Sequence, residues 1–237
     1  MINKILIIFI VLVITSSLKC FIDSNNKKEY LYRRSECQSC KNKLKILDLI
    51  PILSYIFLKG RCRYCKNKIP RDILYYELGG AVLVILYFVI ESKVIFITFL
   101  DIIMIIILYF LAIEDMKKYE VDSTLLIIFF ILSLFKGIYS NLDFYNIAIW
   151  FIIFHILYFL TRGGIGYGDI KLFCIFTLFL NSIDIIYLLI FTFLYAGLVA
   201  VVLLFLKKVT RKTKIPLVPY ITLAYITILT IREWIIW

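Results

Sequence analysis

The chain is a series of apolar runs separated by short polar breaks. The runs cover residues 5–22, 73–90, 94–113, 123–135, 144–160, 170–180, 185–206 and 215–237. Such runs have too few polar residues for a helix with one solvated face, and about 20 apolar residues cross a hydrocarbon core. The alternation of barrel strands is absent. The pattern therefore predicts an all-α, polytopic membrane protein with about eight transmembrane helices. The sixth run is short enough to be tilted or partly re-entrant.

One long polar stretch, residues 23–72, interrupts this pattern. No segment resembles a linker, a low-complexity tract or an internal repeat. We therefore expect three parts: a first transmembrane helix at 1–22, a loop at 23–72 and a multi-helix core at 73–237. The first run resembles a signal peptide, but Lys19 stands where cleavage requires a small residue. We interpret it as a helix that is retained.

Composition supports the membrane interpretation, and charge orients it. Of all residues, 63% are hydrophobic and only 18% are charged, which excludes an ordinary water-soluble domain. Placing the polar stretch in the cytoplasm and alternating the spans puts 23 of the 27 Lys and Arg residues on the cytoplasmic side. The N-terminus is then outside. The net charge of +11 faces anionic lipid, so a nucleic-acid partner is not needed to explain it.

The polar stretch contains two Cys-x-x-Cys pairs, Cys37 with Cys40 and Cys62 with Cys65. Four thiolates presented by two tight turns suit tetrahedral zinc, and disulfides are disfavoured in a reducing cytoplasm. A small polar loop lacks a core, so a metal crosslink would supply folding energy. We expect a closed, structural zinc site. Thiol pairs without metal, or a redox pair, are the alternatives.

The remaining cysteines, Cys20 and Cys174, lie in or beside apolar runs. Because free cysteine behaves as a small apolar side chain, we expect both to be buried.

Two carboxylates at the predicted cytoplasmic edge stand out. Asp115 closely follows an apolar run, and Asp169 ends the glycine-rich segment 163–169 just before the next run. Asp169 could simply cap a helix. Alternatively, the two carboxylates face each other and share one proton, so that one acts as a base on water and the other as an acid toward a carbonyl. That is the machinery of aspartic proteolysis, which needs no metal.

Three further polar residues lie in or near the spans. Asp101 is about one third of the way into the third run, where a buried acid is expected to make a polar contact with a neighbouring helix. The role of Glu77 stays open. His155 is the single histidine, and we expect a hydrogen-bonded core residue rather than a ligand. With no second histidine and no His-Glu-x-x-His, metal-dependent hydrolysis is poorly supported, as is a serine–histidine dyad without Gly-x-Ser-x-Gly.

Several motifs carry a resemblance that extends over nearly the whole chain. They are Ser35–Cys40, Asp48–Tyr55, Leu58–Cys65, Ile69-Pro70, Tyr76-Glu77-Leu78, Asp115, Gly166–Leu172 and Ile215–Tyr220. In their order and spacing these motifs resemble the type IV prepilin peptidases, polytopic aspartic proteases of the Gly-x-Gly-Asp class. Asp115 matches the first catalytic aspartate of that family and Asp169 matches the second, with Gly166, Gly168 and Lys171 in the surrounding motif.

The resemblance implies a bacterial enzyme that removes the short basic leader of prepilins or pseudopilins at the cytoplasmic face of the membrane. Many members also methylate the new N-terminus with S-adenosylmethionine, and the cysteine loop is associated with that activity. Leu49 replaces a usual Asn, Ile165 a usual Met and Val121 a frequent Pro. The change at Leu49 weakens the expectation of methylation more than that of proteolysis. No Rossmann-type glycine loop marks a cofactor site.

Two other functions remain open. The chain could be an ion-coupled transporter with a zinc-stabilised cytoplasmic domain, in which Asp101, Asp115 and Asp169 line a path. It could also be a non-catalytic scaffold that binds partners through its cysteine loop. The sequence indicates neither the oligomeric state nor whether the pilin cut would serve a pilus, competence or secretion.

Overall fold

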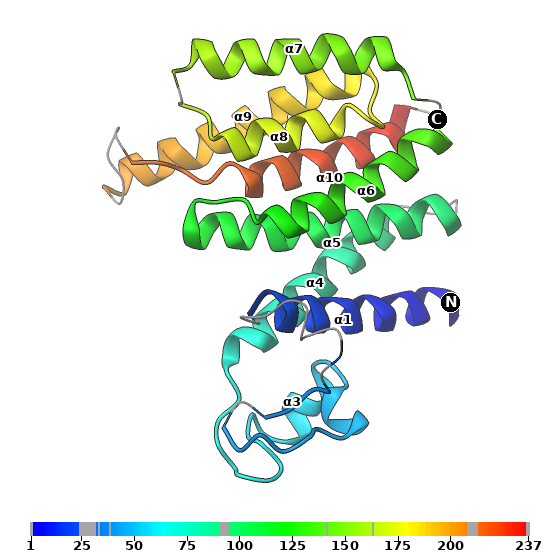
Figure 1. Cartoon of the computed structure of the whole chain (residues 1–237), viewed down its shortest axis with the longest axis vertical. Coiled ribbons are helices and arrows are strands. Elements are labelled where there is room, and N and C mark those ends of the chain that lie inside the picture. The colour runs from blue at the N-terminus through cyan, green and yellow to red at the C-terminus, as the bar shows by residue number, and fades with distance from the viewer. Residues whose placement is uncertain are drawn as a thin grey trace. The chain divides into compact units, whose positions relative to one another are not determined.

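The structure is a computed structural model that describes residues 2–23, 32, 34–37, 39–90, 95–140, 142–162, 164–207 and 213–235. Within these residues the elements are α1 (Ile2–Asp23), η1 (Ile46–Leu49), α3 (Leu53–Phe57), α4 (Arg71–Ile90), α5 (Ile95–Lys118), α6 (Ser123–Tyr139), α7 (Phe144–Leu160), α8 (Tyr167–Phe176), α9 (Ser182–Phe205) and α10 (Val218–Ile235). The all-α prediction is confirmed for this part of the chain (Figure 1). Gly163 of the glycine-rich segment lies outside the described residues.

Each of the eight apolar runs corresponds to one of the longer helices, and the differences are at their ends. Helix α5 continues through the expected break to Lys118, so Asp115 lies within the helix rather than after it. Two lysines in its last turn favour the helix dipole, and Tyr119 ends it with a left-handed φ of 56°. Helix α8 begins at Tyr167, which places Asp169 in its first turn.

Helix α9 is long and apolar enough to cross a membrane by length and composition, and among the described residues it alone meets both criteria. Helices α6 and α7 are apolar but have 17 residues each, or roughly 26 Å at 1.5 Å per residue. Crossing by all eight runs therefore remains a prediction.

Polar side chains set several helix starts. Asp122 accepts hydrogen bonds from the backbone N–H groups of Thr124 and Leu125 and so caps α6. Asp143 caps α7 and Asn181 caps α9 in the same way. These contacts satisfy backbone donors that have no partner within the helix.

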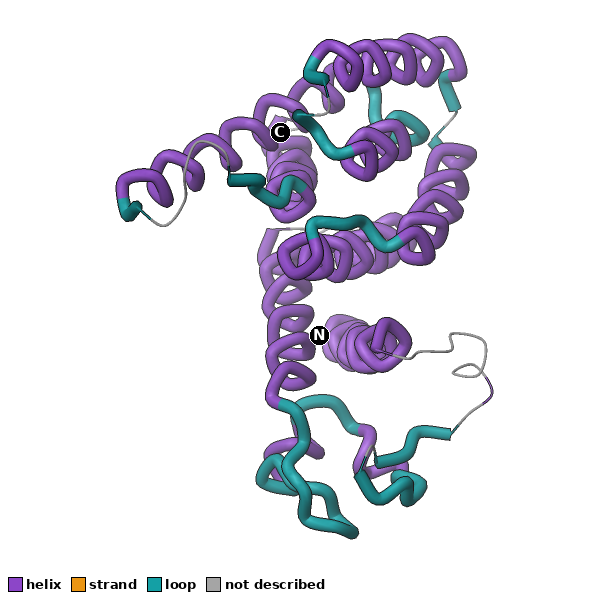
Figure 2. The backbone as a smooth tube through the Cα atoms, turned by 60° about the vertical axis from the view of Figure 1, so that its left-hand side comes forward, coloured by secondary structure: helices purple, strands orange, loops and turns teal. Residues whose placement is uncertain are grey.

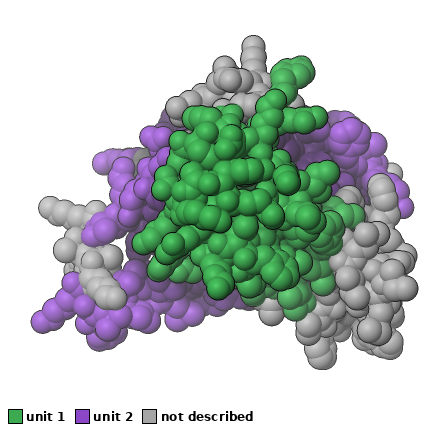
Figure 3. All heavy atoms as spheres, turned by 90° about the horizontal axis from the view of Figure 1, so that it is seen from below, with its two compact units in different colours: residues 1–92 green, residues 93–237 purple. Residues whose placement is uncertain are grey.

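The chain forms two compact units, residues 1–92 and 93–237 (Figure 3). In the first, α1 packs along α4, and a Cβ at Gly80 would lie 2.5 Å from the Thr15 side chain, so the two backbones approach closely. The buried Lys19 lies 3.9 Å from the carboxylate of Asp72 and 4.7 Å from the ring centre of Tyr76. The lysine that makes α1 a poor signal peptide thus helps to join it to α4.

The second unit is built around α5. Its buried positions include Ile102, Met104, Leu108 and Leu111, on all sides of the helix, which is the pattern of a central helix. Helix α5 contacts α6 and α10, α10 contacts α9, and α8 contacts α6 and α7. The tube view in Figure 2 shows that loops connect the helices of the chain.

A buried ion pair ties three helices of this unit together. Asp101 of α5 accepts hydrogen bonds from Lys136 of α6 and, at 2.9 Å, from the Tyr225 hydroxyl of α10. The lysine Nζ also lies 4.9 Å from the ring centre of Phe179. Asp101 is 2% exposed, so its charge is compensated within the protein. This arrangement agrees with the expected structural polar contact.

Candidate active site and candidate metal centre

Asp115 is held at the junction of α5 and α10. It is 5% exposed, and its Oδ2 accepts a hydrogen bond of 3.0 Å from the backbone N–H of Val218, the first residue of α10. The carboxylate lies beyond the predicted span 94–113. Burial raises its pKa, although backbone N–H groups of Val218 and Leu217 oppose that shift by stabilising the ionised form.

Asp169 lies in the first turn of α8, where Gly166 is the N-cap. Its carboxylate accepts a hydrogen bond from the Gly166 backbone N–H, the contact of one half of a capping box. Burial, and then the charge of Asp115, raise the pKa of Asp169 to about 7, while the Gly166 contact lowers it. The two aspartates therefore lie close enough to interact electrostatically. The contact with Gly166 and the electrostatic interaction with Asp115 are compatible with each other, and the sharing of one proton by the two carboxylates stays a prediction.

Close contacts with neighbouring side chains explain why two positions of the motif are glycine. A Cβ at Gly166 would lie 2.9 Å from Oδ2 of Asp169, so a side chain there would push the carboxylate away. A Cβ at Gly168 would lie 2.7 Å from Cγ2 of Val121 in the loop between α5 and α6. Val121 was noticed in the sequence only as a departure from the family pattern. Its contact with Gly168 connects the loop that follows Asp115 to the turn that carries Asp169.

Aromatic side chains surround the motif's tyrosine. The ring of Tyr167, which is 46% exposed, lies 6.3 Å from the His155 ring and 5.3 Å from the Tyr158 ring, both on α7. The Nζ of Lys171 lies 4.9 Å from the centre of the Tyr167 ring. His155 Nδ1 makes the expected hydrogen bond, at 2.8 Å, with the Phe151 carbonyl, but the histidine is half-buried and not a core residue. Sequence spacing did not associate His155 with the motif because 12 residues separate it from Tyr167.

Neighbouring acids at this end of the unit have structural contacts. Glu114 is 2.6 Å from Lys118 one turn later, and Asp122 caps α6. These contacts distinguish them from Asp115, whose carboxylate accepts a hydrogen bond at the start of α10 and interacts electrostatically with Asp169.

In the first unit the structure brings the four predicted metal ligands together. The sulfur atoms of Cys37, Cys40, Cys62 and Cys65 all lie within 4.8 Å of one another. The Sγ atoms of Cys37 and Cys65 are 3.9 Å apart. Four sulfurs at about 2.3 Å from a tetrahedral zinc would be separated by about 3.8 Å. The donor set and its spacing thus fit zinc. Hydrogen bonding by the Cys40 backbone lowers the pKa of Cys37 to about 6. Against a hydrogen bond from the Asn67 backbone, burial and the three neighbouring thiols raise the pKa of Cys65 to about 11, so the four thiols interact as one group.

The two cysteine turns are copies of one another. Cys-x-x-Cys-Lys-Asn-Lys occurs at residues 37–43 and again at 62–68. In each copy the backbone N–H of the first cysteine donates a hydrogen bond to the carbonyl of the asparagine. The lysine after the second cysteine has a positive φ, 57° at Lys41 and 60° at Lys66. An antiparallel bridge closes each turn. The expectation that the chain has no internal repeat was therefore wrong. The repeat is only seven residues long, which makes it easy to miss in the sequence.

The expectation for the other cysteines was wrong for Cys20, which is exposed, whereas Cys174 is partly buried.

Glu77, whose role the sequence left open, holds the segment between the cysteine turns. It is 4% exposed, and its Oε2 accepts a 2.7 Å hydrogen bond from the Ile52 backbone N–H. Ile52 has a φ of 61° and a ψ of −54°, and a 2.6 Å bond from the N–H of Leu53 to the Pro51 carbonyl closes a γ-turn around it. This turn is strained for a β-branched residue. The buried carboxylate helps to maintain it.

Comparison with protein families adds an independent observation. Residues 9–90 match the family model described as Bacterial Peptidase A24 N-terminal domain, and residues 102–205 match the model described as Type IV leader peptidase family. The chain belongs to the type IV leader peptidase family. Comparisons with curated proteins and with solved structures gave no match.

The two family matches fall on different units. The N-terminal match covers the cysteine turns, and the leader peptidase match contains both Asp115 and Asp169. Helix α10, whose Val218 N–H binds Asp115, begins after the matched range. The family resemblance seen in the sequence is thereby confirmed.

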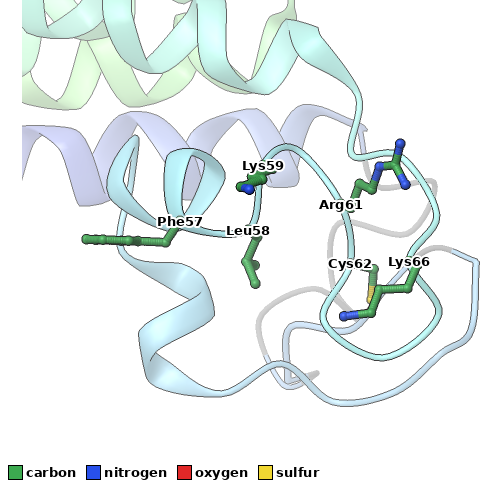
Figure 4. Close-up of a pocket in the computed structure, with 6 residues that line it drawn as sticks. All are labelled: Phe57, Leu58, Lys59, Arg61, Cys62 and Lys66. Atoms are coloured by element: carbon green, nitrogen blue, oxygen red, sulfur yellow. The ribbon is translucent and has the colours of Figure 1, made fainter.

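A hollow of about 400 Å³ lies beside the second cysteine turn of this family member (Figure 4). It is lined by Phe57, Leu58, Lys59, Arg61, Cys62 and Lys66. The lining therefore combines two apolar side chains, three basic ones and the buried Cys62.

Proposed function

We propose that this leader peptidase is a membrane aspartic endopeptidase that cuts the basic leader from prepilins or pseudopilins at the cytoplasmic face. The observation that carries the proposal is the electrostatic coupling of Asp115 with Asp169 in a partly dry site. Family membership supports the substrate class, since the matched range contains both carboxylates.

The two carboxylates have different surroundings, which assigns their roles. Burial raises the pKa of both carboxyls, but two backbone N–H groups oppose this shift at Asp115. The charge of Asp115 raises the pKa of Asp169 further, to about 7. The proton that the pair shares at neutral pH is therefore held mainly by Asp169. The pair titrates as a unit.

In the first step, Asp115 removes a proton from a water molecule as its oxygen attacks the scissile carbonyl carbon. Asp169 donates its proton to the carbonyl oxygen, which gives a neutral gem-diol. In the second step, Asp115 gives its proton to the amide nitrogen and Asp169 removes one from a hydroxyl of the gem-diol, so the C–N bond breaks. Each carboxylate is returned to its starting protonation state.

The predicted topology supports this site for such a substrate. The charge rule places the ends of the runs that carry Asp115 and Asp169 on the side that holds 23 of the 27 basic residues. Large apolar side chains on α7 and α9, such as Phe151 and Leu198, are exposed, and such surfaces suit lipid better than water. A substrate with a basic leader before an apolar helix would place its cleavage site at the same cytoplasmic edge of the membrane as the two aspartates.

The test is leader removal from a co-expressed prepilin by single variants in membranes. We expect Asp115→Asn and Asp169→Asn each to reduce cleavage by about 10²–10⁴-fold. The matched control is Asp143→Asn, because asparagine caps helices as well as aspartate and Asp143 caps α7. Full processing by a correctly inserted Asp169→Asn protein would contradict the dyad.

We also propose that the cysteine cluster holds a structural zinc ion. Its sulfur spacing fits tetrahedral coordination, and four thiolates leave no open position for a water ligand. Zinc would supply folding energy to a segment in which the described hydrophobic residues are mostly exposed.

N-methylation of the new terminus with S-adenosylmethionine is a second proposed activity, and it rests on the cysteine turns and the N-terminal family match. Incubating the protein with labelled cofactor and a cleaved pilin tests it. Absence of label on the new N-terminus, in a preparation that cleaves the leader, would reject methylation alone.

The transporter alternative loses support in this structure. Asp101, which it required along an ion path, is paired with Lys136 and Tyr225. Asp115 lies close enough to Asp169 for its charge to raise the pKa of Asp169, which suits a pair of catalytic carboxyls.

A further inference from the structure

The segment between the cysteine turns exposes large apolar side chains. On η1, Ile46 is 85% and Leu47 is 65% exposed; on α3, Ile56 is 61% and Phe57 is 80% exposed. We call these four residues the apolar tip. Keeping such side chains in water is unfavourable relative to burying them. The tip therefore needs an apolar environment that the described residues of the first unit do not supply.

The surroundings of the apolar tip are strongly basic. Residues 39–71 contain nine Lys and Arg residues and a single acid, Asp48. That acid is itself bonded to Arg63 at 2.7 Å. Lysines such as Lys45 and Lys59 are exposed beside the tip residues. An apolar patch bordered by basic side chains matches the surface of an anionic lipid leaflet, where the apolar groups enter and the cations meet phosphates.

The depth of α3 is set by Glu77. Ile52, the N-cap of α3, is bonded to this buried carboxylate, which lies on α4 inside the apolar run 73–90. Four residues into that run correspond to about 6 Å along the helix. Interfacial helices lie about 5–10 Å deep at the boundary of headgroups and acyl chains. If the run 73–90 crosses the bilayer as predicted, this hydrogen bond holds the start of α3 at the depth of the lipid headgroups.

The direction of the side chains is consistent with this depth. In Figure 4, the Phe57 side chain points away from Arg61, Cys62 and Lys66. Phe57 is thus separated from Arg61 and Lys66, whereas Lys59 lies beside the apolar tip.

We propose that the apolar tip, Ile46, Leu47, Ile56 and Phe57, inserts into the cytoplasmic leaflet and that the surrounding Lys and Arg residues bind anionic lipid phosphates. This inference rests on the cytoplasmic placement in the proposed function. The prepilin leader is a poorer occupant, because it is itself basic. Docking of the cysteine module on the bilayer would fix the metal site and the adjoining hollow at the membrane surface.

The experiment uses the full-length protein in bilayers of phosphatidylcholine with and without phosphatidylglycerol. Phe57→Trp places a fluorophore in the tip, and Tyr64→Trp, in the second cysteine turn, is the matched control. Native tryptophan emission is subtracted with the parent protein. Quenching is measured with lipids brominated near the headgroup end of the acyl chain and with aqueous iodide. Ile46→Trp serves if the Phe57 variant does not fold, as judged by metal content.

We expect brominated lipid to quench Trp emission in the Phe57→Trp protein more than in the Tyr64→Trp protein, with the difference increasing when phosphatidylglycerol is present. Aqueous iodide should quench the Tyr64→Trp protein more than the Phe57→Trp protein. Equal iodide quenching of both variants would mean a solvated tip and would overturn the proposal. Shielding from both quenchers would mean that protein covers the tip, which also overturns it. Leader cleavage is assayed in the same vesicles, so loss of peptidase activity is distinguished from loss of lipid docking.

Discussion

At the scale of single residues, two aspartates of the same type acquire different properties from their neighbours. Asp115 accepts a hydrogen bond from a backbone N–H at the start of α10, and Asp169 accepts one from the N-cap residue of its own helix. Both are desolvated, and the charge of one raises the pKa of the other. An unequal pair of carboxyl groups is what acid–base catalysis on a peptide bond requires.

The first prediction concerns the dependence of cleavage on pH. The reactive form has one proton on the pair, so cleavage should fall as pH rises above about 7, where Asp169 loses its proton. It should also fall in acid, when Asp115 becomes protonated. Initial cleavage rates in vesicles across the pH range measure this profile. A rate that keeps increasing well above pH 8 would contradict the assigned roles.

The same shift predicts an effect on stability. The folded-state pKa of Asp169 is raised from 3.8 to about 7, so folding favours the neutral carboxyl. Its stabilising contribution is complete below about pH 4 and is lost as pH rises through about 7. We therefore expect Asp169→Asn to raise the midpoint of thermal unfolding at pH 8 more than at pH 5, while it abolishes cleavage. Asp143→Asn, at an exposed helix cap, should change neither midpoint appreciably.

A further prediction tests the contact between Gly168 and Val121. The added methyl group of Gly168→Ala would meet Val121 at 2.7 Å, so we expect a loss of about 1–3 kcal/mol in unfolding free energy and a lower cleavage rate. Gly197→Ala in α9 is the control, because nothing lies within 4 Å of its added Cβ. Val121→Ala should restore part of the loss in the double variant. Equal behaviour of the two glycine variants would show that the close approach is unimportant.

At the scale of elements, the cysteine segment is a pair of short repeated turns joined by η1 and α3. The hydrogen bonds within each turn and the positive φ after each second cysteine form the same local structure twice. Local geometry alone cannot stabilise so short a segment, because it buries little apolar surface. The zinc ion proposed for the sulfur cluster would hold the two turns together.

This arrangement predicts about one zinc ion per chain, measured by elemental mass spectrometry on the purified protein. Cys40→Ser removes a predicted ligand, so the metal content should fall and protease sensitivity between the two turns should rise. Cys20→Ser is the control, because Cys20 is exposed on α1 and lies outside the cluster. A metal-free wild-type protein whose cysteine segment resists protease would argue against a structural zinc ion.

At the scale of the whole molecule, buried polar contacts fix how distant helices of the second unit meet. Asp101, Lys136 and Tyr225 join α5, α6 and α10, and the Val218 N–H joins α10 to Asp115. The ion pair and the candidate active site therefore lie at different points along α5, and both involve α10. A change in the packing of α10 would therefore alter both the ion pair and the candidate active site.

We therefore predict that Asp101→Asn destabilises the second unit by about 3–5 kcal/mol, because it leaves the Lys136 charge buried without a counter-ion. Replacing both residues, as Asp101→Leu with Lys136→Leu, should cost less than the single change. Unfolding in denaturant, followed in the same detergent for all variants, provides the comparison. A single variant as stable as the wild type would show that the pair does not stabilise the packing.

The sequence by itself determined the helical class, the positions of the apolar helices, the four clustered cysteines and the family. Those features depend on local composition and on residues close together in the chain, which carry their own signals. It also singled out Asp115 and Asp169, through an apolar boundary and a glycine-rich turn. Only the tertiary structure decided what each carboxylate contacts, because the partners are far away in sequence: Val218 is 103 residues from Asp115. The same reason applies to Lys136 with Asp101, Ile52 with Glu77 and Val121 with Gly168, since such contacts are set by helix packing rather than by any local pattern.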